Sequence, residues 1–314
     1  MRAADIERIV DESSMKLLQS SSPSVRYWLL RDIIRKDRED ASLQRAFAEC
    51  ERYPARLRLL RSISDDGTWP VPNSLLRQSG TGALGRADQR RVTHYKNTLS
   101  LLHFVTLPGD ERLELALERF YDGQSEDGYL NGPMTHGLPQ PHFNGYALYV
   151  LIGFDKKDDP RVKKAVERLM TSQRADGGWN MPYLQDVRYL EEYSSLKQDD
   201  FMGLMNTEER HRHDPREMGH IPSCHWTTMM VLWGLAELVA NRRSRCVQKG
   251  ADFLLGRFFQ RNPHANFYQS QKNWTTLKYP NNRCNGLAAL SVLTKINRGH
   301  DDPRMEKPID WLTS

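Results

Sequence analysis

Apolar residues recur every three or four positions along most of this chain, and that spacing predicts α-helices. Five segments are rich in small and apolar residues, which predicts buried helices. They begin at "SPSVRYWLL", "THYKNTLSLL", "PHFNGYALYV", "SCHWTTMMVL" and "RCNGLAALSV". About six other segments carry a single apolar stripe and are otherwise charged, so we expect amphipathic helices on the outside. Because no stretch alternates apolar and polar residues with a period of two, the pattern predicts few strands.

The amphipathic helices belong to a repeat that ends in an Asp-Gly turn. "DDPRVKKAVERLMTSQRADGGWN", from Asp158, and "GDERLELALERFYDGQSEDGYLN", from Gly109, share an acidic helix start, an amphipathic helix, a Gln and an Asp-Gly pair. "LLRSISDDGTWP" ends a more divergent copy, and "DDPRMEKPIDWL" begins a last one. The acidic pair is placed to cap its helix, and Pro160 suits the first turn. Glycine permits the tight turn because it tolerates positive φ.

Two stretches interrupt the repeat. Residues at about 70–92 are rich in Gly and Arg, and residues at about 182–221 are polar, so we expect both to be insertions. The longer insertion is expected to cross one face of the protein, with room for a short helix of its own. Loops of this length are usually functional or mobile. With these insertions, residues 1–314 are predicted to form one all-α domain of helical hairpins.

Composition sets wider limits on what the protein is. The chain has 314 residues, of which 39% are hydrophobic and 27% charged, as is typical of a soluble globular protein. No apolar run is long enough to predict a transmembrane segment, and the first residues lack a signal peptide's layout, so we expect a cytoplasmic location. The net charge of +5 is mild and no nucleic-acid-binding motif accompanies it, so no nucleic-acid partner is predicted.

The stretch "SQRADGGWN" resembles the repeat of squalene and hopene cyclases and of prenyltransferase β subunits. Its matching residues are Gln173, Asp176, Gly177, Gly178 and Trp179. The resemblance implies an α/α toroid, in which inner helices ring a central cavity and outer helices surround them. The length of the chain leaves room for one toroid, so it looks like a stand-alone, single-toroid member of this group.

The resemblance also implies an isoprenoid-handling enzyme, with prenyl transfer or terpenoid cyclisation-like chemistry in an apolar, aromatic cavity. The expected ligand is an apolar or prenyl-diphosphate small molecule. The chain lacks the Asp-x-Asp-Asp acid of the cyclases and an evident Asp-Asp-x-x-Asp magnesium motif, which argues against their standard chemistry. The alternative is a non-catalytic toroid scaffold or ligand-binding protein. A prenyltransferase-β-like subunit, a third hypothesis, would require a protein partner.

Histidine and cysteine open four of the predicted buried helices at the same phase. These residues are His94, His142, Cys224 and Cys284. If the helix starts face one cavity, two imidazoles and two thiolates form a plausible tetrahedral zinc site, so zinc is the predicted cofactor. Cys224 also matches the zinc-binding cysteine of the prenyltransferases, although Pro222 stands where they have an aspartate. The alternative is that each is a buried packing residue.

Further candidates lie near the same helix starts. Cys224 and His225 are the predicted catalytic pair. The predicted substrate-binding aromatics line the cavity, where their rings would stabilise carbocations, and two arginines would hold a diphosphate. They are Tyr95, Phe143, Tyr146, Trp226, Arg90 and Arg91. The aromatics are equally consistent with plain packing between helices. "HRHDPREMGH" in the second insertion is either a metal-binding loop or simply a polar one.

Overall fold

A computed structural model describes residues 3–71, 73, 83–130, 138–264, 269–277, 285–299 and 301–313. This described part is helical, and its only β-type pairing is an isolated bridge between Trp179 and Cys224. The all-α prediction is therefore confirmed. None of the described helices combines the length and the apolar character that crossing a membrane requires.

Contacts divide the chain into two compact units. One comprises Met1–Pro70 and Asn97–Ala116, and the other comprises Val71–Lys96 and Leu117–Ser314. Two helices, α6 (Ala83–His103) and α7 (Glu111–Glu118), have residues in both units. The single domain expected from the sequence stays a prediction.

The first unit begins with short helices. They are α1 (Ala3–Leu18), α2 (Pro23–Trp28), the π-helical turn Leu29–Ile33, α3 (Ala41–Glu51) and α4 (Pro54–Arg61). Asp40 caps α3 by accepting a hydrogen bond from the Ser42 backbone N–H, at 2.8 Å. Leu30, Leu43 and Ala46 form a small core between α3 and the segment before it.

The second unit holds most of the repeat. Its further α-helices are α8 (Pro141–Gly153), α9 (Pro160–Thr171), α10 (Gln198–Leu204), α11 (His225–Leu235), α12 (Arg245–Gly256), α13 (Gly286–Lys295) and α14 (Glu306–Thr313). Short 3₁₀ helices span Arg119–Tyr121, Val187–Tyr189, Glu191–Tyr193, Glu208–Arg212, Pro215–Glu217, Val239–Arg243, Gln271–Thr275 and Pro303–Met305. In this order the apolar helices α8 and α11 are each followed by an amphipathic one, α9 or α12, with α10 of the insertion between the two pairs.

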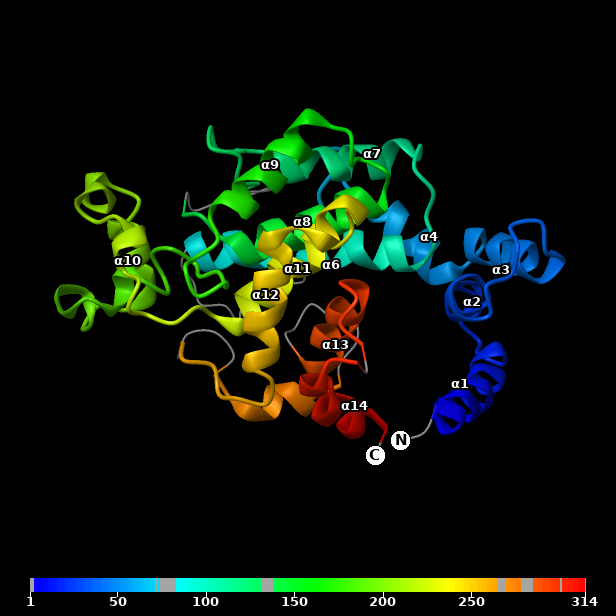
Figure 1. Ribbon diagram of the computed structural model, residues 1–314. Helices are drawn as coiled ribbons and strands as arrows, with labels where there is room; N and C mark the ends of the chain where they lie inside the picture. Colours follow the sequence, from blue (N-terminus) through cyan, green and yellow to red (C-terminus); the bar gives the residue numbers. More distant parts are fainter. Residues whose placement is uncertain are drawn as a thin grey trace. The chain divides into compact units, whose positions relative to one another are not determined.

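Helices α8 and α11 are the most deeply buried and lie side by side (Figure 1). Their backbones touch at two glycines: a Cβ on Gly145 would overlap the carbonyl of Met230, and one on Gly234 would overlap that of Gly145. By contrast, α9 buries one stripe, formed by Val162, Ala165, Val166 and Leu169. The predicted difference between the two helix sets is therefore present in these helices.

The Asp-Gly turns of the repeat share one geometry. Their glycines have positive φ, of +77° at Gly67, +106° at Gly128 and +92° at Gly177. Each glycine also presses on a carbonyl in the fifth residue of a later helix, at Leu115 of α7, Lys164 of α9 and Lys249 of α12 respectively; a Cβ would lie 2.5–2.8 Å from that oxygen. Glycine is thus required twice, by backbone conformation and by close approach.

The Gln and Trp of the motif fasten the same turn. Gln173 Nε2 donates to the carbonyl of Gly177 in its own turn (2.8 Å) and to that of Cys246 in the first turn of α12 (2.7 Å). Trp179 Nε1 donates back to Leu169 O in α9, at 2.8 Å. The motif therefore joins one amphipathic helix to the next.

The two predicted insertions differ in outcome. Helix α6 begins at Ala83, so residues 83–92 are helical and not a loop, and His94 lies within a helix instead of opening one. The Arg and Gln residues of this segment are good helix formers, which accounts for the helix. Residues 74–82 lie outside the described part.

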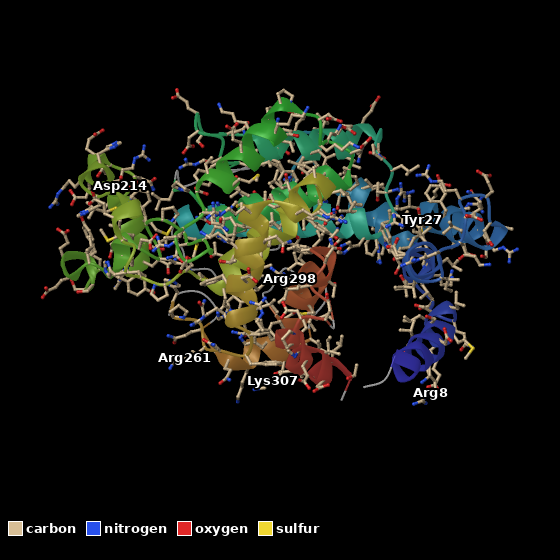
Figure 2. All side chains as sticks on the ribbon, viewed as in Figure 1. Arg8, Tyr27, Asp214, Arg261, Arg298 and Lys307 are labelled. Carbon is tan, nitrogen blue, oxygen red and sulfur yellow. The ribbon has the colours of Figure 1, made fainter. Side chains whose placement is uncertain are left out.

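The second insertion, 182–221, supplies most of a separate hydrophobic cluster, which Leu138 and Met181 complete. Figure 2 labels Asp214 of this insertion. The buried members of the cluster include Leu184, Val187, Phe201, Met202 and Met205. Helix α10 supplies two of them, Phe201 and Met202. The insertion is thus a small packed structure and not merely a polar excursion.

Candidate functional site

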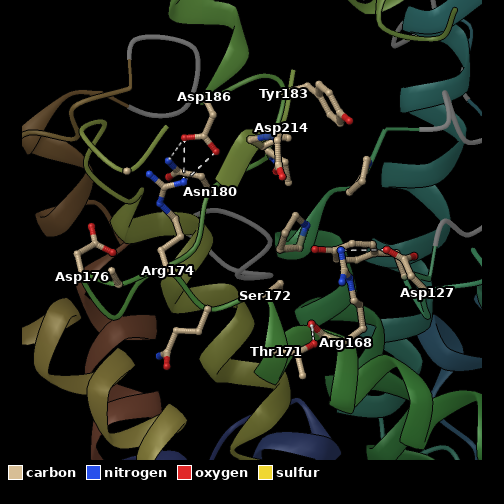
Figure 3. A pocket seen from close by; sticks show the side chains of 18 residues that line it. Asp127, Arg168, Thr171, Ser172, Arg174, Asp176, Asn180, Tyr183, Asp186 and Asp214 are labelled. Carbon is tan, nitrogen blue, oxygen red and sulfur yellow. Dashed lines mark hydrogen bonds and ion pairs between the residues drawn. The ribbon is translucent and has the colours of Figure 1, made fainter. Parts of the chain in front are cut away.

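A pocket of about 520 Å³ lies where α8 begins, α9 ends and the 182–221 insertion departs (Figure 3). It is lined by Asp127, Tyr129, Pro139, Pro141, Arg168, Thr171, Ser172, Gln173, Arg174, Ala175, Asp176, Asn180, Pro182, Tyr183, Asp186, Asp214, Pro215 and Gly219. The repeat motif itself therefore forms one wall, and the insertion forms another.

Asp186 is the most deeply buried acid of this lining, with 1% of its surface exposed. Arg174 Nη1 lies 3.1 Å from its carboxylate, and Asn180 Nδ2 donates to it at 2.9 Å. Burial raises the pKa of Asp186 to about 7, because desolvation disfavours the charged form more than Arg174 and Asn180 favour it. The side chain is thus suited to exchange a proton near neutral pH.

Arg174 ties the insertion down at both ends. While Nη1 pairs with Asp186 near the start of the insertion, Nη2 donates to the carbonyls of Met218 and Ile221 near its end, at 2.8 and 2.7 Å. Because Arg174 belongs to the repeat turn, the insertion is anchored to the helical scaffold at the edge of the pocket.

A second ion pair lies on the other side of the pocket (Figure 3). Arg168 Nη2 is 2.9 Å from Asp127, and its guanidinium lies 4.7 Å from the centre of the Tyr129 ring. This pair is more exposed than the first, with 34% and 48% of the two side chains accessible. Exposed pairs of this kind contribute little to stability, so this pair is the weaker of the two.

Asp176, the acid of the motif, has a structural task. Its carboxylate accepts hydrogen bonds from the Ser223 backbone N–H (2.9 Å) and hydroxyl (2.7 Å), and from the Gly178 N–H (3.1 Å). These bonds close the turn and hold the residues that lead into α11.

The predicted catalytic Cys224 is the N-cap of α11 and is completely buried. Its Sγ accepts hydrogen bonds from the Thr227 backbone N–H at 3.5 Å and from Asn262 Nδ2 at 3.2 Å. Its own N–H donates to Asn180 Oδ1, at 2.6 Å. Asn180 therefore connects Cys224 to Asp186 of the pocket.

His225, the first residue of α11, is also completely buried. Its ring packs against those of Trp226 and Trp274, with centroids 4.5 and 4.9 Å away. Among the described residues, neither ring nitrogen has a hydrogen-bond partner. Burial, helped by the charges of Arg257 and His264, lowers the pKa of His225 to about 3, so the ring is neutral.

The other predicted aromatics gather between α6 and α8. Tyr95 stacks on Phe143 at 5.2 Å, and Tyr146 donates a hydrogen bond to Tyr95 O at 3.0 Å. His94 and His142 border this group: the His94 ring lies 5.0 Å from that of Phe120, and the His142 ring lies 4.2 Å from that of Phe143. These contacts are those of packed helices.

The two predicted arginines lie in different environments. Arg90 is exposed, whereas Arg91 is buried with its guanidinium 4.0 Å from the Phe143 ring. Arg91 also donates to Gln140 Oε1 at 3.1 Å. In the sequence, Gln140 stands between Pro139 and Pro141, which line the pocket. No described residue of the predicted site lines the pocket, although His142 directly follows the lining residue Pro141.

The zinc prediction rests on residues of which one, Cys284, lies outside the described part. Within that part, the possible ligand atoms of His94, His142 and Cys224 do not all lie within 4.8 Å of one another. Those of another group, Glu192, Glu209 and His213, do lie within that distance. That group is held together by Tyr193, whose hydroxyl lies 2.7 Å from Glu209 and 2.6 Å from His213, and Arg212 pairs with both glutamates. The four-residue zinc site stays a prediction, and we derive no chemical step from it.

Sequence reasoning missed Asp186 and Arg174. Arg174 lies within the quoted motif at a position that the motif leaves open, and Asp186 is one of several acids in a polar segment. The order of these segments held a signal: the insertion follows the repeat turn directly in the sequence, so its first residues had to lie near that turn. Comparisons with models of protein families, with curated proteins and with solved structures find no match.

Proposed function

We propose that this protein is an enzyme that binds a small molecule in the Asp186 pocket and exchanges a proton with it through Asp186. The observation that carries this proposal is a buried carboxyl with a pKa of about 7 in the wall of a pocket of about 520 Å³. Strongly shifted acids in concave sites are characteristic of catalytic groups.

For the ligand class we propose an isoprenoid, and for the fold an α/α toroid of helical hairpins. The resemblance of "SQRADGGWN" supports both proposals, and the motif's hydrogen bonds from one amphipathic helix to the next support the proposed fold. A geranyl chain is small enough for the pocket volume. An acid of pKa about 7 suits proton exchange with oxygen or nitrogen; protonating an alkene, as the cyclases do, calls for a stronger acid.

The test uses two glycines of the insertion at which a side chain meets open space. Gly219 lines the pocket, whereas Gly203 in α10 does not, and a Cβ on either would have no heavy atom within 4 Å among the described residues. We expect Gly219→Phe to abolish saturable binding of geranyl compounds measured by calorimetry, and Gly203→Phe to leave it intact. Equal binding by both variants would place the ligand elsewhere.

Turnover separates the enzyme from its alternative, a non-catalytic ligand-binding protein. The proposal expects Asp186→Asn to lose product formation while keeping ligand binding within about threefold, because asparagine retains the shape of the side chain. Product formation is measured by mass spectrometry over pH 5–9. A wild type that binds the ligand but forms no product at any pH in this range would favour the non-catalytic protein.

A further inference from the structure

The pocket carries more negative than positive charge. Its lining has four aspartates, Asp127, Asp176, Asp186 and Asp214, against two arginines, Arg168 and Arg174. No Lys or His is found among the lining residues that the structure describes. The charge of this described lining is therefore −2 with every group ionised, and −1 when Asp186 holds its proton.

Both arginines are already engaged with lining aspartates. Arg168 pairs with Asp127, and Arg174 pairs with Asp186 while also donating to two backbone carbonyls. An anionic ligand would share each guanidinium with an aspartate that already offsets its charge, so its attraction to the arginine would be weakened. A cationic ligand would instead be attracted by the carboxylates, whose oxygens accept several hydrogen bonds at once.

The ends of the neighbouring helices do not change this balance. The start of α8 contributes Pro141 to the lining, and the end of α9 contributes Thr171 and Ser172. A helix N-terminus is equivalent to about +0.5 charge and a C-terminus to about −0.5, so these two effects oppose each other. The aspartate side chains therefore decide the sign.

We propose that the pocket selects a ligand whose polar end carries a positive charge, such as a primary ammonium, and discriminates against a diphosphate. This inference rests on the proposed function, since it concerns the ligand of the same pocket. Asp214 and Tyr183 belong to the insertion side of the lining, and Thr171 and Ser172 belong to the end of α9 (Figure 3). An ammonium between these walls would donate to the Asp214 carboxylate and to the hydroxyl oxygens.

Three probes with one hydrocarbon chain test the charge preference: geranylamine, geraniol and geranyl diphosphate, titrated calorimetrically at pH 7 and 50 mM salt. We expect geranylamine to bind at least about tenfold more tightly than geranyl diphosphate, with geraniol between them. Raising the salt to 500 mM should weaken the amine and narrow the difference. Asp214→Asn should reduce amine affinity about five- to tenfold, whereas Asp199→Asn, at an exposed position of α10 outside the lining, should not.

The outcomes separate the two proposals. Tightest binding of geranyl diphosphate, lost in Gly219→Phe, would overturn the charge preference and keep the isoprenoid pocket. Equal binding of the three probes would likewise overturn the charge preference. Amine binding that survives in Gly219→Phe would overturn the assignment of this pocket, and no binding by any probe would overturn both proposals.

Discussion

Replacing Asp186 by asparagine should remove a pH dependence from the stability of the protein. The pKa of this carboxyl is about 7 in the folded protein against an ordinary value of 3.8. Over that interval the folded state holds one proton that the unfolded chain has released. The stabilising contribution of that proton is fully present below pH 3.8 and is lost as the pH rises through about 7.

The size of the effect follows from the pKa difference. Each pH unit of the interval changes the free energy of unfolding by about 1.4 kcal/mol, so about three units amount to about 4 kcal/mol. The wild type should therefore lose about 4 kcal/mol relative to Asp186→Asn between pH 4 and pH 8. Taking the difference between the two proteins cancels the titration of all other groups they share.

Urea unfolding followed by tryptophan fluorescence, repeated at half-unit pH steps, measures this difference. Asp127→Asn is the matched control: it also removes a pocket aspartate that pairs with an arginine, but it keeps Asp186 and should keep the full pH step. A wild-type-minus-Asp186→Asn difference that varies by less than about 1 kcal/mol from pH 4 to pH 8 would refute the buried-acid argument.

Three further predictions concern the scaffold and the zinc site. Gly177→Ala should lower the free energy of unfolding by about 3 kcal/mol or more, because a clash with Lys249 O adds to the strain of positive φ. Gly109 has positive φ in open space, so Gly109→Ala should lower it by only about 1 kcal/mol. Equal losses in urea unfolding would contradict the contact between the Gly177 turn and α12. Gly145→Ala should destabilise by more than about 3 kcal/mol by pushing α8 from α11, while Gly256→Ala, at the open end of α12, should be neutral or slightly stabilising; thermal melting distinguishes them. The zinc site predicted from sequence requires about one zinc per purified chain, lost in Cys224→Ala and in Cys284→Ala; a metal-free wild type by elemental analysis would eliminate it.

Periodicity predicted best the helices that are apolar all round or along one clear stripe. α8 is apolar on every side and α9 on one stripe, so both were visible in the sequence, as was the Asp159 cap of α9. The turn glycines were predicted from their conformational freedom. Their second role, contact with a carbonyl of a later helix, depends on tertiary packing that one sequence does not display.

The candidate site was less accessible to sequence reasoning for two physical reasons. The shifted pKa of Asp186 arises from burial within an insertion whose few core residues are spread among many polar ones, so the composition of the segment looked polar. His94 was aligned with the starts of other helices because the polar residues before it resemble a loop, yet they continue α6 back to Ala83. In both segments the residues are polar, but the structure places them in packed or helical positions that polarity alone does not predict.

The most direct test of Asp186 as a proton-exchanging group in a ligand pocket is its own titration. Carbon-13 NMR of aspartate-labelled protein, with the Asp186 carboxyl resonance assigned by its loss in Asp186→Asn, gives the midpoint with and without geranylamine. The account predicts a midpoint near pH 7 that the ligand lowers, because an adjacent ammonium favours the carboxylate. A midpoint near pH 4, or one that saturating ligand leaves unmoved, would contradict it.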